Sequence, residues 1–235
     1  MAAASALAQS GGQPAQFMSY GAGARGLGMG GAFFAVADDA SASYWNPAAM
    51  TLLERKEFTA MQANLFADTT LNFFTYAHPT ASRGTWAFSM TQLKSVGFEK
   101  ISITANSSGD EIVDIKSLGT FDNTERALAF SWGREVSDKL AFGVMAKNIT
   151  RQLDTSKDSF NAIDIAMLQK FSKTYRMAMG IQNVFSMTSG DTDDELPLTL
   201  KLGQALSLFK GGLVFGFDLV KPMKADLTWR FGGEY

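Results

Sequence analysis

The pattern G-x-G-x-x-G occurs twice in "GAGARGLGMGG", residues 21–31. In dinucleotide-binding proteins these glycines let a turn approach the pyrophosphate closely. The motif there follows a buried strand, and an acidic residue that binds the ribose comes about 20 residues later. Here the preceding residues, "SGGQPAQ", contain no strand pattern, and the nearest acids, Asp38 and Asp39, come too early. We therefore predict that the glycines serve close packing and do not bind a phosphate.

The other polar groups are poorly spaced for catalysis or metal binding. Adjacent residues of an extended chain point to opposite faces, so Asp38 and Asp39 cannot easily share one substrate atom. A calcium loop of twelve residues has a glycine in its middle and a glutamate at its end. "GDTDDE", residues 190–195, has neither at those spacings after its first aspartate, which predicts a solvated loop. His78 is the single histidine and cysteine is absent; with Pro79 after it, His78 is expected in an exposed turn. We expect no catalytic residue, no metal, no cofactor and no enzymatic activity.

Composition narrows the class of protein further. The net charge of -2 without a cluster of Lys and Arg argues against a nucleic-acid partner. Abundant Gly (22) and Phe (19) with scarce Pro (5) favour an all-β fold. The opening "MAAASALAQS" resembles the end of a secretory signal, so residues 1–8 are predicted to be its remnant; the alternative is a small-residue terminus. No run of about 20 apolar residues could form a transmembrane helix, which leaves a membrane β-barrel open.

From about Lys56 onward, segments of about ten residues alternate in hydrophobicity. In "LAFGVMAKN", residues 140–148, the even positions up to 146 are apolar and the odd positions are small, charged or Met. A soluble β-sandwich also alternates, but here the second face is rich in Gly and Ala. Connections also alternate between short links (134–139, 172–174, 209–212) and longer ones near 95–120, 153–160 and 186–196. This asymmetry is typical of outer-membrane barrels.

The alternation predicts a transmembrane antiparallel up-and-down β-barrel of about ten strands. The expected strands are 56–66, 70–77, 84–94, 121–133, 140–152, 160–171, 175–186, 197–208, 212–221 and 225–235.

The segment "GARGLGMGGAFFAVADDASASYWNPAAM", residues 23–50, resembles the FadL-like outer-membrane barrel superfamily, most closely its PorV/PorQ branch. Three blocks carry the resemblance: the glycine-rich run 23–32, "AVADDAS" at 35–41, and "NPA" at 46–48. "LFADTTLNFFTYAHP", "AIDIAMLQKF", "GIQNVF", "LPLTLKLG" and "FDLVKP" follow in the expected order. The sequence departs at Ala49, where relatives usually carry Gly, so a positive φ there would be costly.

This resemblance implies that residues 9–50 form a plug, or hatch, inside a barrel built by residues 51–235. The residues of the implied plug motif are Gly28, Gly30, Gly31, Asp38, Asp39, Ser41, Asn46, Pro47 and Ala48. Gly and Ala permit close approach to the wall, while Asp38, Asp39 and Ser41 would meet polar lumen groups. Asn46, before a proline, is expected to be extended and to end the plug. Relatives typically close with fourteen strands, so we expect a C-terminally truncated form rather than a complete ten-stranded barrel.

The resemblance also implies a place in the bacterial outer membrane, in contact with its lipid. It implies passage of hydrophobic compounds, such as long-chain fatty acids, past the plug. The alternative is a PorV/PorQ-like accessory of the type IX secretion system that binds exported cargo proteins. A third hypothesis is a soluble periplasmic β protein, because alternation alone does not distinguish a membrane barrel from a soluble sheet.

Overall fold

A computed structural model describes residues 14–105, 112–190, 192 and 194–235. The described chain is all-β, with ten strands and a few short helices. The strands are β1 (Glu57–Asn64), β2 (Thr69–Thr80), β3 (Gly84–Ala105), β4 (Ile112–Ser137), β5 (Leu140–Leu153), β6 (Ser156–Lys170), β7 (Tyr175–Ser189), β8 (Thr199–Leu208), β9 (Leu213–Pro222) and β10 (Thr228–Glu234).

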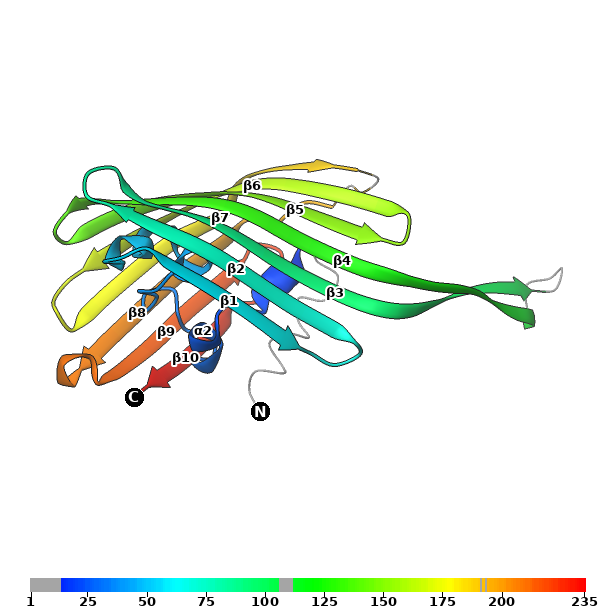
Figure 1. Cartoon of the computed structure of the whole chain (residues 1–235), viewed down its shortest axis with the longest axis horizontal. Coiled ribbons are helices and arrows are strands. Elements are labelled where there is room, and N and C mark those ends of the chain that lie inside the picture. Colours follow the sequence, from blue (N-terminus) through cyan, green and yellow to red (C-terminus); the bar gives the residue numbers. More distant parts are fainter. Residues whose placement is uncertain (1–13, 106–111, 191, 193) are drawn as a thin grey trace.

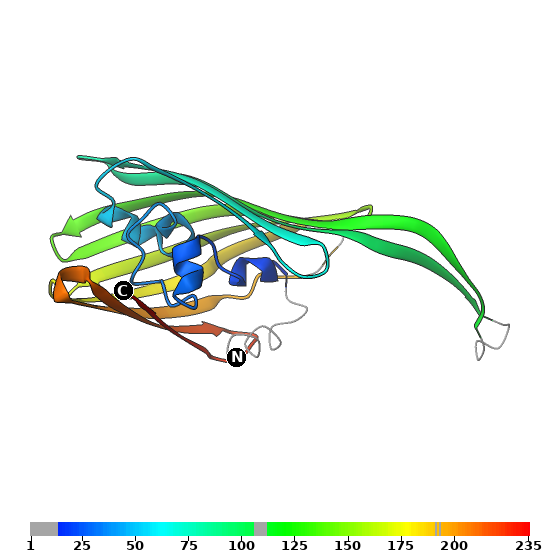
Figure 2. The same cartoon turned by 60° about the horizontal axis from the view of Figure 1, so that its bottom comes forward.

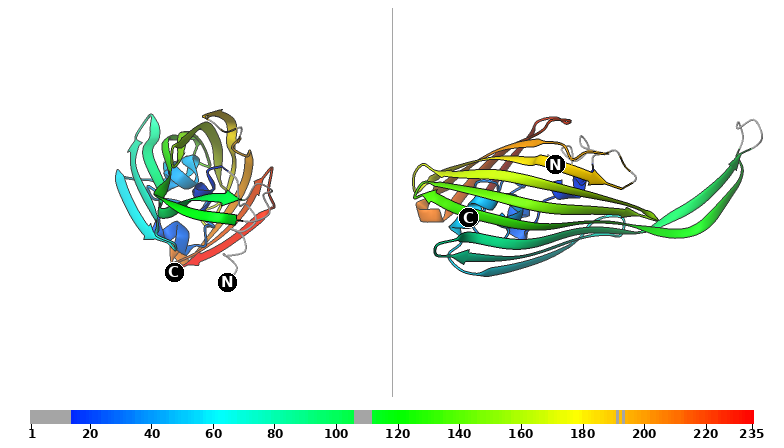
Figure 3. Two further views of the ribbon diagram at one scale, coloured as in Figure 1. Left: turned by 90° about the vertical axis from the view of Figure 1, so that its right-hand side faces the viewer. Right: turned by 90° about the horizontal axis from the view of Figure 1, so that it is seen from above.

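The strands form one sheet in sequence order, and each is antiparallel to the next. The sheet curls around the N-terminal part of the chain (Figures 1 and 3). β1 and β10 are its two edges, and no pairing joins them among the described residues. The prediction of an all-β, up-and-down antiparallel fold with about ten strands is confirmed; the sheet is open between β1 and β10.

The predicted alternation is present, and its apolar side faces outward. On β5, Phe142 and Val144 are 44% and 40% exposed, whereas Ala141 and Met145 are 0% and 2% exposed. Other strands repeat this arrangement, with exposed Phe88, Phe130, Ile165, Met179, Leu200, Phe215 and Phe231. A soluble sandwich turns its polar faces to solvent, whereas this sheet exposes large apolar residues on its outer face and buries small, polar and some apolar residues on its inner face.

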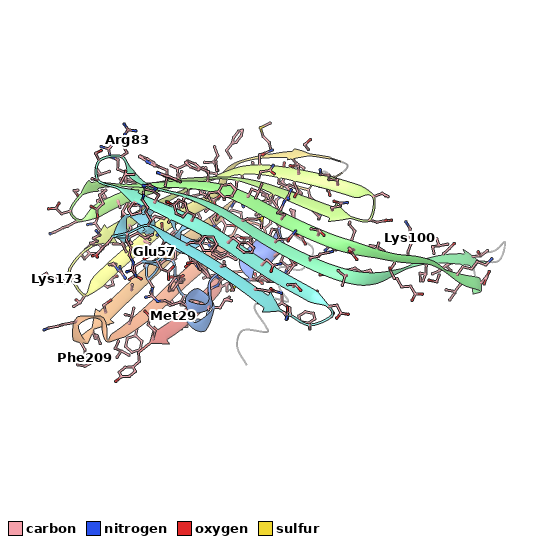
Figure 4. The ribbon with its side chains drawn as sticks, in the orientation of Figure 1. Met29, Glu57, Arg83, Lys100, Lys173 and Phe209 are labelled. Atoms are coloured by element: carbon pink, nitrogen blue, oxygen red, sulfur yellow. The ribbon has the colours of Figure 1, made fainter. Side chains whose placement is uncertain are left out.

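The ends of the sheet differ in their connections. Tight turns join the strands near Arg83, Lys173 and Phe209, which lie together at one end in Figure 4. At the other end, two connections that we predicted to be long are mostly strand in the described residues. Residues 95–105 and 112–120 extend β3 and β4, because branched residues such as Ile103 and Ile115 pair directly. Near 153–160, β6 begins at Ser156 after a short turn. The segment before β8 remains a connection.

The N-terminal segment, residues 14–53, lies on the concave face of the sheet (Figure 2). It contains η1 (Gln16–Ser19), α2 (Ala24–Gly28), α3 (Ala42–Trp45) and η2 (Pro47–Leu52), and η3 (Phe209–Gly211) lies between β8 and β9. None of the helices in the described ranges is long and apolar enough to span a membrane. The main buried cluster joins Phe33, Val36, Trp45 and Met50 of the segment to Phe73 of β2.

Candidate functional site

Glycines on the inner face of the sheet allow the N-terminal segment to contact the wall backbone. A Cβ added to Gly143 of β5 would lie 2.2 Å from the Ala48 nitrogen. Added to Gly216 of β9, it would lie 2.2 Å from the Ala32 oxygen. These distances leave no space for a side chain. Similar close contacts recur along the inner face, with segment backbone at Gly133, Gly203 and Gly232 and with the Phe34 ring at Gly180. We call the whole set the glycine seat: Gly133, Gly143, Gly180, Gly203, Gly216 and Gly232.

The doubled glycine motif packs against the segment's own side chains. A Cβ on Gly21 or Gly26 would approach the Trp45 ring to 2.9 Å or 2.8 Å. A Cβ on Gly23 would lie 3.1 Å from that of Ser41. The indole nitrogen of Trp45 donates a hydrogen bond to the Ala22 oxygen at 2.8 Å. These glycines therefore accommodate a buried tryptophan.

The second half of the glycine run meets the last strand. Gly30 has a φ of +63°, and a Cβ there would lie 2.8 Å from the Phe231 oxygen of β10. Gly31 has a φ of +75° and lies against the Arg230 side chain. Gly28, by contrast, is exposed and has open space around it. Gly30 and Gly31 therefore contact the wall, and Gly28 does not.

Arg25 joins the glycine-rich run and the acidic part of the motif to the edge of the sheet. Its Nε and Nη2 donate to the two carboxylate oxygens of Glu234 on β10, at 2.7 Å and 2.5 Å. Its Nη1 donates to Asp38 at 2.5 Å, and its guanidinium lies 5.1 Å from the centre of the Phe33 ring. The hydrogen bonds to Glu234 raise the pKa of the Arg25 guanidinium above its ordinary value. Arg25 thus links α2 to Asp38 and to Glu234 on β10.

Asp38 and Asp39 have different roles. Asp38 pairs with Arg25 and lies 3.8 Å from the Arg176 guanidinium. Asp39 accepts hydrogen bonds from the Ser41 backbone nitrogen at 2.8 Å and from its hydroxyl at 2.5 Å, which is a local Asx turn. The two carboxylates do not converge on a shared position for a substrate, and Asp39 contacts Arg25 only at 3.4 Å.

Asn46 orders the middle of the segment. It is extended, with a φ of -154°, as expected for a residue before proline. Its amide donates to the Phe34 oxygen at 2.8 Å, and its side-chain oxygen accepts from the Ala48 nitrogen at 3.0 Å. The side chain is fully buried. The helix η2, which begins at Pro47, separates Asn46 from β1.

Polar side chains of the wall hold the segment at several strands. Asp218 of β9 accepts hydrogen bonds from the backbone nitrogens of Phe33 and Phe34, both at 2.9 Å. The hydroxyl oxygens of Ser43 and of Thr75 on β2 are 2.7 Å apart. The links thus reach both sides of the curved sheet.

The segment also connects the two unpaired edges of the sheet. On β1, the Glu57 carboxylate accepts a hydrogen bond from the Ala40 nitrogen at 3.0 Å. On β10, Glu234 binds Arg25. Figure 4 shows Glu57 on β1 and Met29 just after α2, near the two edges. Between β1 and β10, the contacts that replace a strand ladder therefore come from residues 25–40.

The inner face also carries a buried ion pair and a second apolar cluster. Lys147 and Asp164 form a 2.7 Å ion pair with side chains 5% and 3% exposed. A second buried cluster contains Phe17 of η1 together with wall and loop residues: Leu71, Leu93, Ala127, Ile149, Phe160, Ala162 and Leu196. This cluster presents hydrocarbon and aromatic surface inside the curved sheet.

The acidic loop and the histidine form no reactive group. In the described ranges, no three His, Asp or Glu side chains gather as metal ligands. Asp194 pairs with Arg151 at 3.1 Å, while Asp191 and Asp193 lie outside the described residues. The expectation that His78 lies in a turn is wrong: His78 is in β2, and its ring stacks on Trp86 at 4.8 Å, because β2 continues to Thr80.

Two hollows of about 590 Å³ and 340 Å³ follow β7 to β10 on the outer face. Their walls are outward side chains, including Phe215, Phe231, Leu200 and Leu219. Neither hollow lies between the N-terminal segment and the wall.

The sequence motif located the segment but missed its partners on the wall. Asp218, Glu234, Glu57 and Thr75 are distant in sequence from the residues they bind. One signal was available: glycines recur on the inward positions of successive strands, where ordinary strand packing disfavours glycine.

Comparison with known proteins gives a family and a fold likeness. No curated protein matches the chain. Among solved structures, the chain is similar to "Outer-membrane expressed OmpT of Vibrio cholerae", with 13% identity and a TM-score of 0.42. The alignment covers 77% of this chain and 60% of that one, so the chain spans less than two thirds of its length. Residues 2–180 match the model of the Uncharacterised protein family (UPF0164). The chain therefore belongs to the UPF0164 family.

Proposed function

We propose that this chain is an outer-membrane protein in which the N-terminal segment is a plug, and that it passes hydrophobic compounds such as long-chain fatty acids across the membrane. The outward apolar face supports a place in lipid, because membrane barrels expose apolar residues and turn small or polar residues inward. The resemblance of residues 23–50 to the FadL-like superfamily supports the same location and a transport role rather than a catalytic one.

The glycine seat is the observation that carries this proposal. It accepts the segment through close backbone contact, and the polar links that accompany it are individual hydrogen bonds and ion pairs. Each such link contributes about 1 kcal/mol, and the buried cluster of Phe33, Trp45 and Phe73 adds apolar packing to them. Passage therefore requires that the segment shifts against the wall as a unit. The apolar cluster around Phe17 and Phe160 is buried in this structure, and a shift of the segment would expose it to a hydrocarbon chain during passage.

Uptake of a labelled long-chain fatty acid into lipid vesicles containing the full chain tests the proposal. We expect faster uptake than in protein-free vesicles, and an unchanged rate for the control variant Gly28→Ala, whose site has open space. Uptake equal to that of protein-free vesicles would contradict transport. Recovery of the chain in the soluble fraction without detergent would instead support a soluble periplasmic β protein.

A second candidate function is favoured by one feature: β3 and β4 extend beyond their neighbouring strands β2 and β5. An outward projection suits a PorV/PorQ-like accessory that binds exported cargo for the type IX secretion system. Deletion of the gene in a bacterium with that system should then leave cargo proteins unattached to the surface. Normal surface attachment in the deletion strain would remove this candidate.

A further inference from the structure

The ends of β3 and β4 form a free two-stranded ribbon. β3 pairs with β2 only as far as Ser95, and β4 pairs with β5 only from Asn123. Beyond those positions the ribbon, residues 96–105 and 112–122, pairs only within itself among the described residues. It projects from the end opposite the tight turns, with Lys100 on its side (Figures 2 and 4). Ten residues of strand extend about 30 Å.

The ribbon has one apolar face. Ile103 lies directly opposite Ile115, and Ile101 lies two residues from Ile103 on the same face. These three side chains are 51–58% exposed. The opposite face is polar, since Ser102 pairs with Lys116, and Thr104 with Asp114. The ribbon therefore presents branched apolar side chains to solvent along one face.

Contacts at its base hold the ribbon in place. Phe98 stacks on Phe121 with ring centres 5.5 Å apart. Lys100 forms an ion pair with Asp154 in the turn between β5 and β6, and Lys94 forms one with Asp122 at 3.3 Å. A two-stranded hairpin is marginal in water on its own, so these contacts pre-organise the ribbon for a partner.

The outer part of the β3 edge offers a regular stretch of backbone. Consecutive residues from Ile101 to Ala105 all have partners on β4. Opposite this stretch, β4 has a bulge at Val113. Nearer the base both strands are irregular, at Val96, Gly97 and Lys100 on β3 and at Leu118 and Gly119 on β4. Bulges protect an edge against an added strand, whereas a regular edge accepts one. This free edge is the continuation of the β3 edge that pairs with β2 as far as Ser95.

The charges of the ribbon argue against a polyanionic partner. Lys100 and Lys116 are paired with Asp154 and Asp114. No cluster of free cations is therefore available on the described ribbon for nucleic acid or for an anionic lipid surface. Affinity must come from backbone hydrogen bonds and apolar contact, which are the means of β-strand addition.

We propose that the ribbon binds an extended polypeptide segment of another protein, which adds as a strand to β3 and places alternate apolar side chains on the isoleucine face. This inference deepens the second candidate function, because it states how a protein partner is held. It is independent of fatty-acid passage.

Binding of a synthetic twelve-residue peptide of alternating valine and threonine, flanked by lysines, tests the proposal on the full chain in detergent. We expect saturable binding, and slower hydrogen exchange of the backbone amides of residues 101–105. Ile103→Ser with Ile115→Ser should weaken binding at least about tenfold, since two central apolar contacts are lost. The matched control on the polar face, Ser102→Ala with Thr104→Ala, should bind normally.

A second probe is the same peptide with N-methyl groups on alternate residues, which cannot donate hydrogen bonds along one edge. It should fail to bind. The proposal is overturned if the methylated peptide binds equally well, if the isoleucine variant binds like the control, or if exchange slows only outside the ribbon. Fatty-acid uptake by the isoleucine variant should equal that of the unmodified chain, so failure of this proposal is distinguishable from failure of transport.

Discussion

Single residues decide how the N-terminal segment contacts the wall. Glycine is required on the inner face where backbone meets backbone, as at Gly143 against Ala48. Charged residues then select the position of the segment, as Arg25 does between Asp38 and Glu234. Backbone contact at glycines and ion pairs between charged side chains therefore both hold the segment at this interface.

Substitution at Gly143 should release the segment. Gly143→Val places a side chain where the Ala48 backbone lies, so residues near 48 must move away from β5. We expect trypsin to cleave after Arg25 about tenfold faster, because local opening exposes the site. Mass spectrometry of the fragments measures the rate. A rate equal to that of Gly28→Ala would show that the contact does not hold the segment.

The ion pair between Arg25 and Glu234 should be energetically modest. Both side chains are about one-third exposed, at 35% and 29%, so solvent screens the pair. A double-mutant cycle with Arg25→Ala and Glu234→Ala should give a coupling free energy of about 1 kcal/mol. Urea unfolding in detergent micelles provides the four free energies. Strictly additive effects would indicate that the two groups do not interact in solution.

At the scale of elements, period-two alternation makes a strand visible in the sequence. The large apolar residues at even positions of 140–146, with Ala141 and Gly143 between them, predicted both β5 and the side that faces outward. Residues 96–120 lack so regular an alternation, because bulges shift the register near Gly97 and Gly119. That is why we predicted a long connection where β3 and β4 in fact continue.

The motif at residues 23–50 predicted the position of the site but not its contacts. Asp38 and Asn46 could be selected because they belong to a distinctive run. Their environment depends on the register of strands far along the chain, such as β9 with Asp218 and β10 with Glu234. A pattern of local alternation predicts which face a residue occupies, and it contains no information on which loop will reach it.

The middle of the outward face of β5 should tolerate apolar residues only. Val144 is exposed on that face in the middle of the strand. In lipid vesicles, Val144→Arg should lower the free energy of unfolding by about 2–4 kcal/mol if the position is near the bilayer centre. Thr150→Arg, nearer the end of β5, should cost much less. Equal stability of both variants, measured by urea titration in vesicles, would argue that lipid does not cover this face.

At the scale of the whole molecule, three parts have separate roles. The curved sheet presents apolar residues outward, the N-terminal segment occupies its concave face and ties β1 to β10, and the ribbon projects from one end. The segment and the ribbon are built from different parts of the chain (Figure 3). Transport past the one and protein binding by the other can therefore be tested separately.

Replacing the ribbon residues 98–121 by a short turn tests this separation. The ladders of β3 with β2 and of β4 with β5 end before these residues, so the wall should remain folded. We expect the same stability in vesicles within about 1 kcal/mol, and unchanged fatty-acid uptake. Loss of the folded wall in urea titration would show that the ribbon is part of the core structure.

The central claim is that the N-terminal segment must move for a hydrophobic compound to pass. The hydroxyl oxygens of Ser43 and Thr75 are 2.7 Å apart and the chain has no cysteine, so Ser43→Cys with Thr75→Cys can lock the segment to β2 by a disulfide. The direct measurement is uptake of a labelled long-chain fatty acid into vesicles containing this double variant, oxidised and then reduced, beside each single variant. The account predicts that oxidation abolishes uptake and that reduction restores it to the rate of the single variants. Uptake by the oxidised double variant at the same rate as by the reduced form would contradict it.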